Sequence, residues 1–133
     1  MKRLLAFILA AALMLCACGS TTFELALAED SVTQTGLTYQ LTVTGNGEFI
    51  NDPANYYLEH NVGGAWVRVD GLVVIGAESE TYSGSGTYTF SLDWSSRYGE
   101  LEGGLYRLYK TVNCDGEDVK LTADFQIVTA VAE

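Results

Sequence analysis

Two glutamates, Glu100 and Glu102, flank Leu101, and a pair of carboxylates is the machinery of glycoside hydrolysis. One carboxyl group protonates the leaving oxygen while the other attacks the sugar or activates water, provided that a cleft holds the two at a set separation. Here the pair is expected in a turn at the corner of a domain too small to offer a deep cleft. We therefore predict solvated turn charges and no catalytic residue.

Metal and nucleophile chemistry is limited because the 133 residues contain one histidine and three cysteines. A multi-histidine metal centre is excluded, and His60 has no Gly-x-Ser-x-Gly elbow with which to build a triad. Asp115, Glu117 and Asp118 surround Gly116, and calcium takes roughly six to eight such oxygens. Their spacing does not match an EF-hand, which favours a hydrophilic hairpin turn and leaves a weak calcium site open. We expect no cofactor and no metal.

A basic and aromatic stretch, Arg107, Tyr109 and Lys110, is the best candidate for a binding face in this acidic chain. Alternation places Arg107 and Tyr109 on the strand face opposite Tyr106 and Leu108. Together with Lys110 they make the only dense basic and aromatic stretch in the sequence, so the three are grouped as one predicted binding face.

Three further apolar features are interpreted as core. Trp66 and Trp94 have the side chains of sugar-stacking platforms, but their places at a strand start and a strand end predict core or rim aromatics. The run Leu72–Ile75 between two glycines predicts a buried inner strand, and the alternative is an exposed docking edge.

The charge balance excludes one class of partner. Seven basic residues stand against 17 acidic ones, a net charge of −10, whereas a nucleic-acid binder needs a basic face for phosphate. At 48% apolar and 18% charged, the chain can bury a core and is one domain in size.

The N-terminus is typical of an export signal. Lys2 and Arg3 precede the 12-residue apolar run Leu4–Leu15, which is shorter than the roughly 20 residues of a membrane span. The following Leu15-Cys16-Ala17-Cys18 resembles the lipobox of bacterial lipoproteins. The resemblance implies that residues 1–17 are a signal peptide and that Cys18 is acylated. Ordinary signal peptidase cleavage nearby is the alternative.

This processing defines the expected organisation and location. Residues 18–22 form the lipidated cysteine and a short tether, and residues 23–130 form the folded domain. The protein is then lipid-anchored at the extracytoplasmic face of the cell membrane through Cys18. Whether the host has an outer membrane stays open. Cys114 is left as the single thiol of the domain and is interpreted as a small buried hydrophobe.

Alternation of period two recurs from residue 23 onward and predicts half-buried antiparallel strands. The clearest runs are 23–27, 37–43, 88–94 and 119–127, and residues 56–61 and 65–70 read as a hairpin around Gly63-Gly64. Seven or eight short strands separated by glycine-rich turns predict an all-β, two-sheet antiparallel sandwich.

A family resemblance rests on the segment before the second-last predicted strand. Leu101, Gly104 and Tyr106 are similar to the tyrosine corner of immunoglobulin-like (Ig-like) sandwiches, in which a tyrosine hydroxyl bonds to upstream backbone. Together with Asp93-Trp94, Gly64-Ala65-Trp66 and Arg107, this stretch resembles a bacterial Ig-like domain found on small lipoproteins of Gram-positive bacteria. Gly103 is a departure, because such corners often have proline there.

The resemblance implies a fold and carries over no catalytic residue. We therefore expect a non-enzymatic, membrane-anchored Ig-like module whose partner is an envelope protein or polymer. The alternative is a small hydrolase of an envelope polymer that uses the carboxylate pair. The identity of the partner and the oligomeric state are not readable from the chain.

Overall fold

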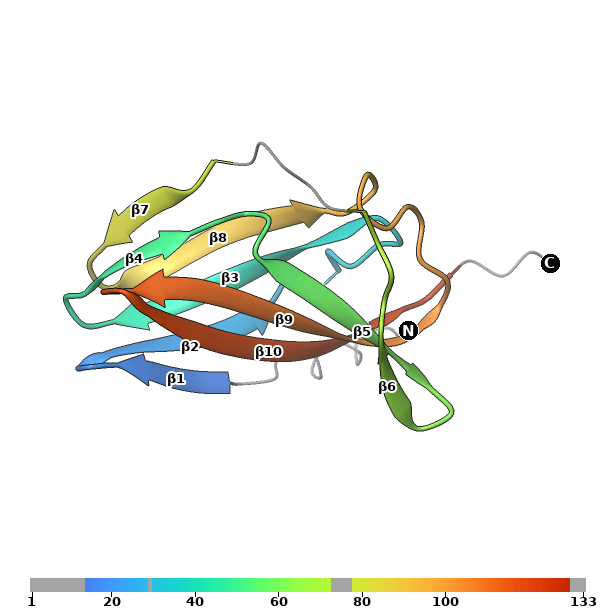
Figure 1. Ribbon diagram of the computed structural model, residues 1–133, viewed down its shortest axis with the longest axis horizontal. Helices are drawn as coiled ribbons and strands as arrows, with labels where there is room; N and C mark the ends of the chain where they lie inside the picture. The colour runs from blue at the N-terminus through green and yellow to red at the C-terminus, as the bar shows by residue number, and fades with distance from the viewer. Residues whose placement is uncertain (1–13, 29, 73–77, 130–133) are drawn as a thin grey trace.

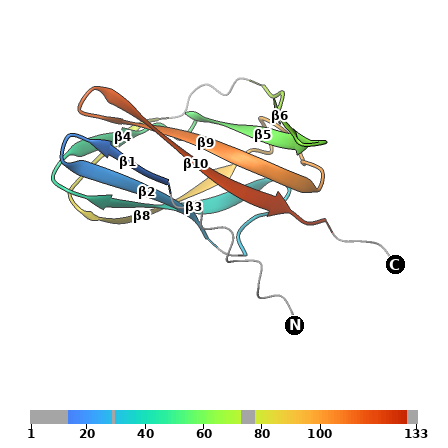
Figure 2. The same ribbon diagram turned by 90° about the horizontal axis from the view of Figure 1, so that it is seen from below.

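Two antiparallel β-sheets packed face to face make up the computed structural model, which describes residues 14–28, 30–72 and 78–129 (Figure 1). The first sheet has four strands in the order β1 (Met14–Cys18), β2 (Thr21–Leu27), β3 (Gly36–Thr44) and β8 (Gly86–Asp93). The second has six and runs β6 (Ala65–Arg68), β5 (Tyr56–Val62), β9 (Gly104–Cys114), β4 (Glu48–Asn51) and β7 (Glu80–Ser83), with β10 (Glu117–Ile127) paired to β9. Figure 2 shows the two layers from the side.

Strand β9 is the centre of the second sheet. Its whole length pairs with β10, while its other edge pairs with β5 near Leu108 and with β4 near Cys114. β4 and β5 are consecutive in the chain and are separated by a turn at Asp52–Asn55, in which the Asn55 amide donates to the Asp52 carbonyl at 3.0 Å. Because Pro53 has no amide hydrogen, it cannot continue the ladder through this turn.

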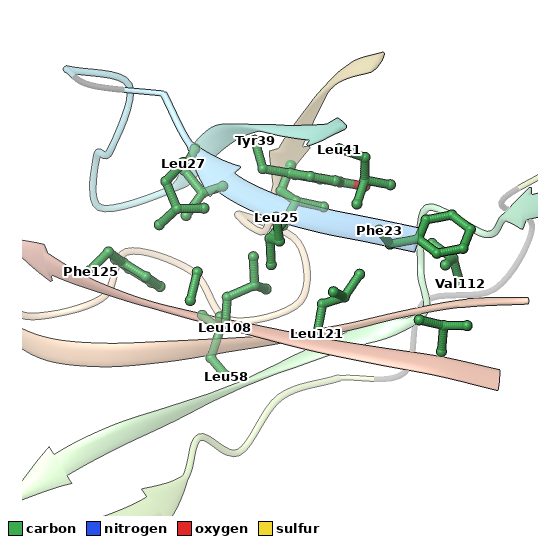
Figure 3. Packing of buried hydrophobic residues seen from close by; sticks show 14 of the residues in the cluster. Phe23, Leu25, Leu27, Tyr39, Leu41, Leu58, Leu108, Val112, Leu121 and Phe125 are labelled. Atoms are coloured by element: carbon green, nitrogen blue, oxygen red, sulfur yellow. The ribbon is translucent and has the colours of Figure 1, made fainter. Parts of the chain in front are cut away.

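The core lies between the sheets and follows from the alternation of apolar side chains. Every second residue of β2, β3, β9 and β10 is buried. Figure 3 shows Leu25 of β2 above Leu108 and Leu121 of the second sheet. The largest fully buried side chains are Trp94, Tyr39, Tyr106, Phe23, Phe49 and Lys110.

The expected fold is confirmed, since the described residues form an all-β sandwich of two antiparallel sheets. The number of strands is ten in the described residues, more than the expected seven or eight. Two causes are visible: the turn at Asp52–Asn55 divides the edge of β9 opposite β10 between β4 and β5, and β1 arises from the N-terminal segment.

The structure confirms one of three local predictions and differs from the other two. Cys114 is buried as predicted, with no exposed surface. Leu72 is 71% exposed, against its predicted burial, while residues 73–75 of the same run lie outside the described residues. The predicted tether over 18–22 is partly ordered, because Thr21 begins β2 and is 2% exposed.

Most of the expected signal peptide lies outside the described residues, which begin at Met14. Residues Met14–Cys18 pair with β2 as an edge strand. Within the part of the chain that the structure describes, no helix is long and apolar enough to cross a membrane.

Candidate functional site

The outer surface of the second sheet carries a group of aromatic and basic side chains that we call the aromatic face. It consists of Tyr57, Trp66, Arg68, Arg107 and Tyr109. The alternation of β9 buries Tyr106, Leu108 and Lys110, so the residues between them point outward. The register then sets Tyr57 of β5 directly opposite Tyr109.

Ring contacts fix the aromatic face as one layer. Tyr57 and Tyr109 stack with their ring centroids 4.5 Å apart and their planes at 6°. The guanidinium of Arg68 lies 3.9 Å from the centroid of the Tyr57 ring, and that of Arg107 lies 4.1 Å from the Trp66 ring. Such cation–π contacts hold the long arginine side chains in one geometry against the rings.

Carboxylates neutralise part of the charge on the aromatic face. Arg107 Nε donates to Asp124 Oδ1 at 2.6 Å and Nη2 donates to Oδ2 at 3.2 Å, a bidentate pair that raises the pKa of Arg107. The Tyr109 hydroxyl donates to Glu59 Oε1 at 2.7 Å. Desolvation, followed by this hydrogen bond, raises the pKa of Tyr109, so its hydroxyl stays a donor at neutral pH.

The structure corrects one predicted member of the binding face, Lys110. Its side chain has no exposed surface and lies on the core side of β9. Its Nζ donates to the Asp52 carbonyl at 2.7 Å and to the Asn55 carbonyl at 3.4 Å. Burial lowers the pKa of Lys110 to about 8, an effect that the nearby Asp52 carboxylate partly opposes.

The other two predicted positions, Arg107 and Tyr109, do lie together on the outer sheet surface. Sequence reasoning did not include Tyr57 and Arg68. The Gly63-Gly64 hairpin contained part of the signal, because its register sets Arg68 of β6 opposite Glu59 of β5, while the separate pairing of β5 with β9 sets Tyr57 opposite Tyr109. Trp66, interpreted as core or rim, is half-buried on the outer surface, whereas Trp94 is fully buried.

Tyr106 has the geometry described for a tyrosine corner. Tyr106 is 1% exposed, and its hydroxyl donates to the Glu102 carbonyl, four residues upstream, at 2.8 Å. Burial, with a smaller contribution from the Glu102 carboxylate, raises the pKa of Tyr106. Leu101 itself is 7% exposed and belongs to the core.

Both the backbone conformation at position 104 and the packing of His60 against it require glycine. Its φ is +150°, in the region that side chains other than glycine rarely adopt, and a Cβ there would lie 2.6 Å from His60 Nε2. His60 stacks on Tyr106 at a centroid distance of 4.3 Å. The corner thus joins the start of β9 to β5 through these three residues.

The comparison with known families agrees with the two-sheet sandwich. Residues 19–126 match the family described as bacterial Ig-like domain. The chain belongs to this family. No curated protein matches the chain. Members of the family are generally non-catalytic, which agrees with the expectation of an interaction or structural module.

In this bacterial Ig-like domain the carboxylates Glu100 and Glu102 line an open cavity of about 350 Å³, together with His60 and Tyr106. The corner therefore contains an open cavity, whereas the sequence predicted solvated turn charges without a deep cleft. The Glu102 carboxylate lies 4.0 Å from His60 Nδ1, and its side chain is 79% exposed. A carboxylate so open to water lacks the dry environment in which hydrolases tune a catalytic acid.

The turn at Asp115–Gly116 joins β9 to β10 and contains the predicted acidic loop. Asn113 holds it, since its Oδ1 accepts from the Gly116 amide at 3.2 Å and its Nδ2 donates to Asp118 Oδ1 at 3.2 Å. With Asp115 and Gly116 at positive φ, this geometry is that of a hydrophilic hairpin turn.

Cys18 and Cys114 lie side by side beneath this turn. Cys18 Sγ donates to the Cys114 carbonyl at 3.1 Å, and the two Sγ atoms and an Asp115 carboxylate oxygen lie within 4.8 Å of one another. Burial and the neighbouring Cys18 raise the pKa of Cys114 to about 12. These groups supply three ligand atoms, whereas a structural zinc site takes four.

Proposed function

We propose that this bacterial Ig-like domain is a lipid-anchored, non-enzymatic module of the cell envelope that binds an envelope protein or polymer through its aromatic face. The observation that carries the proposal is the layer of Tyr57, Trp66, Arg68, Arg107 and Tyr109 on the outer sheet surface.

The chemistry of the aromatic face favours recognition. Aromatic and arginine side chains are enriched where proteins bind partners, because they offer a large contact area. The stacked Tyr57–Tyr109 pair and the Arg107–Asp124 pair are already ordered in the free domain. Binding then costs little side-chain entropy, which is the main advantage of a preorganised surface.

The proposed anchor is the acylated Cys18, supported by the Leu15-Cys16-Ala17-Cys18 sequence after a short apolar run. Cleavage after Ala17 would remove all of β1 except Cys18. An acylated sulfur does not fit the buried position against Cys114, so Cys18 would turn outward at Gly19, where φ is +61°. Two residues, Gly19 and Ser20, then link the anchor to β2.

The test of the proposed function is recovery of partners from intact envelopes. The lipidated protein is cross-linked in its host membrane and compared with the double variant Trp66→Ala, Tyr109→Ala. Its control is Thr42→Ala, Thr87→Ala, which truncates two exposed side chains of the first sheet. We expect cross-linked species that the control retains and the aromatic variant loses.

Two results would contradict the proposal. Equal recovery by the aromatic variant and the wild-type protein would show that the aromatic face is not the binding surface. Detection of an unmodified Cys18 thiol in the membrane fraction would remove the anchor.

A further inference from the structure

A second open cavity, of about 350 Å³, lies where the chain leaves β6 and crosses toward the first sheet. Its walls include three tyrosines and two arginines: Tyr56, Tyr57, Tyr98, Arg68 and Arg97. The size is at the lower end of ligand-binding cavities and suits a ligand of one ring.

Arg97 is fixed in the wall of this cavity. Its Nη1 donates to the Tyr56 carbonyl at 2.7 Å and its Nη2 donates to the Ala54 carbonyl at 2.9 Å. The guanidinium lies 4.4 Å from the centroid of the Tyr56 ring. A guanidinium has five donor hydrogens, so further donors remain for a ligand.

The segment 69–72, which follows β6 and which we call the crossing segment, is held against the same wall of the cavity. The Leu72 amide donates to the Arg97 carbonyl at 2.8 Å, and the Val69 amide donates to the Leu58 carbonyl at 3.0 Å. Gly71 passes so close to Tyr98 that a Cβ would lie 2.5 Å from the ring. These contacts keep the cavity shaped in the free protein.

The charges of the two arginines are not neutralised by ion pairs. Within residues 14–28, 30–72 and 78–129, neither Arg68 nor Arg97 has a carboxylate oxygen within 4.0 Å, in contrast to Arg107. Arg68 is exposed and lies over the Tyr57 ring. In a chain with 17 acidic residues against seven basic ones, two unpaired arginines on one cavity form a local anion-binding environment.

We infer that this cavity binds a sugar-sized ring that carries one anionic group. The guanidinium groups of Arg68 and Arg97 match a carboxylate or phosphate, the side chains of Tyr56 and Tyr98 supply an apolar wall for a sugar ring, and Asp70 is placed to accept from a hydroxyl. The net charge of −10 disfavours a polyanion, because the rest of the chain repels it. The site adjoins the aromatic face through Tyr57 and Arg68, and it does not depend on the lipid anchor.

The experiment titrates the full-length protein, in a non-ionic detergent, with glucuronate, glucose 6-phosphate and glucose by calorimetry. A ligand of this size is expected to bind with a Kd of about 1 mM. We expect at least one anionic sugar to bind at this strength and glucose to bind about tenfold more weakly. The tighter of the two anions identifies the charged group as carboxylate or phosphate.

Matched variants localise the binding. Arg68→Gln removes an exposed guanidinium and should raise the Kd of the more tightly bound anionic sugar about tenfold. The control Lys120→Gln removes one charge from the exposed side of β10 and should leave this Kd unchanged. The inference is overturned if neither anion binds below about 10 mM, if glucose binds equally well, or if both variants weaken binding alike. These outcomes leave the proposed anchoring and aromatic face untouched, because those are tested by cross-linking in membranes.

Discussion

Lys110 offers a direct test of the electrostatics of the core. Its ammonium is fully buried, and burial lowers its pKa to about 8, against about 10.4 in an unfolded chain. Between these two values the folded state binds fewer protons than the unfolded state, so its free energy of unfolding rises with pH. The linkage relation gives a gain of about 2 kcal/mol between pH 7 and pH 9.5 from this one group.

The substitution Lys110→Met removes the titrating group at similar volume. It also removes the donors to the Asp52 and Asn55 carbonyls, which costs about 1.5–3 kcal/mol and is offset in part by the loss of a buried charge. The cost of the lost donors does not depend on pH, whereas the effect of the buried charge does, so the informative quantity is the change with pH in the difference between the two proteins.

The assay is urea unfolding of both proteins at several pH values from 7 to 9.5, followed by tryptophan fluorescence. Burial raises the pKa of Tyr39, Tyr56 and Cys114 to about 12, so each of these groups destabilises the fold as pH rises past its unfolded value. They are present in both proteins and cancel in the difference. The free energy of unfolding of the wild-type protein minus that of Lys110→Met should therefore grow by about 2 kcal/mol between pH 7 and pH 9.5.

The matched control is Lys120→Met, on the exposed side of the neighbouring strand β10. Its pH profile should run parallel to that of the wild-type protein. A difference between the wild type and Lys110→Met that stays constant from pH 7 to 9.5 would refute the reasoning, and so would an equal slope in the control.

Three more changes have defined outcomes. Tyr106→Phe removes the hydroxyl that donates to Glu102 and should lower the free energy of unfolding by about 0.5–1.5 kcal/mol in the same urea assay; no change would contradict its role in the corner. Gly104→Ala should lower the free energy of unfolding by about 1–3 kcal/mol because φ at this position is +150°; an unchanged free energy of unfolding would show that the backbone accommodates a Cβ there without strain. The chain from Gly19 onward should not co-sediment with anionic vesicles at physiological salt, since loss of Lys2 and Arg3 leaves five basic residues against 17 acidic ones; strong sedimentation would mean that the local basic residues outweigh the net charge.

The alternation of apolar residues predicted β2, β3, β8 and β10 with their buried faces, but not the short strands β1, β4 and β7. Phe23, Leu25 and Leu27 are all buried as their period of two requires, because an antiparallel sheet with one wet face has only one side to bury. The corner at Tyr106 was also readable, since its partner lies only four residues away in the chain.

Long-range partners account for what the sequence did not reveal. The alternation of β9 places Lys110 inward, but its basic and aromatic neighbours in the sequence led to its grouping with Arg107 and Tyr109. The local pattern does not show that the Asp52–Asn55 turn supplies carbonyl acceptors. The two arginines at the second cavity are 29 positions apart in the chain, and long-range hydrogen bonds from Arg97 to the Tyr56 and Ala54 carbonyls bring them together. Their shared role follows from topology and not from spacing.

The place of Cys18 in the fold decides how the proposed anchor would present the domain. Thr21, where β2 begins, lies against Gly47 beside Cys114, so the anchored end is the end that carries the acidic turn 115–118. Anionic headgroups would repel this turn and lift the domain from the lipid. At a rise of about 3.4 Å per residue, Tyr109 and Arg107 lie about 17 and 24 Å further along β9. That is at least two screening lengths of about 8 Å at physiological salt, so the aromatic face would meet its partner beyond the reach of the membrane charge.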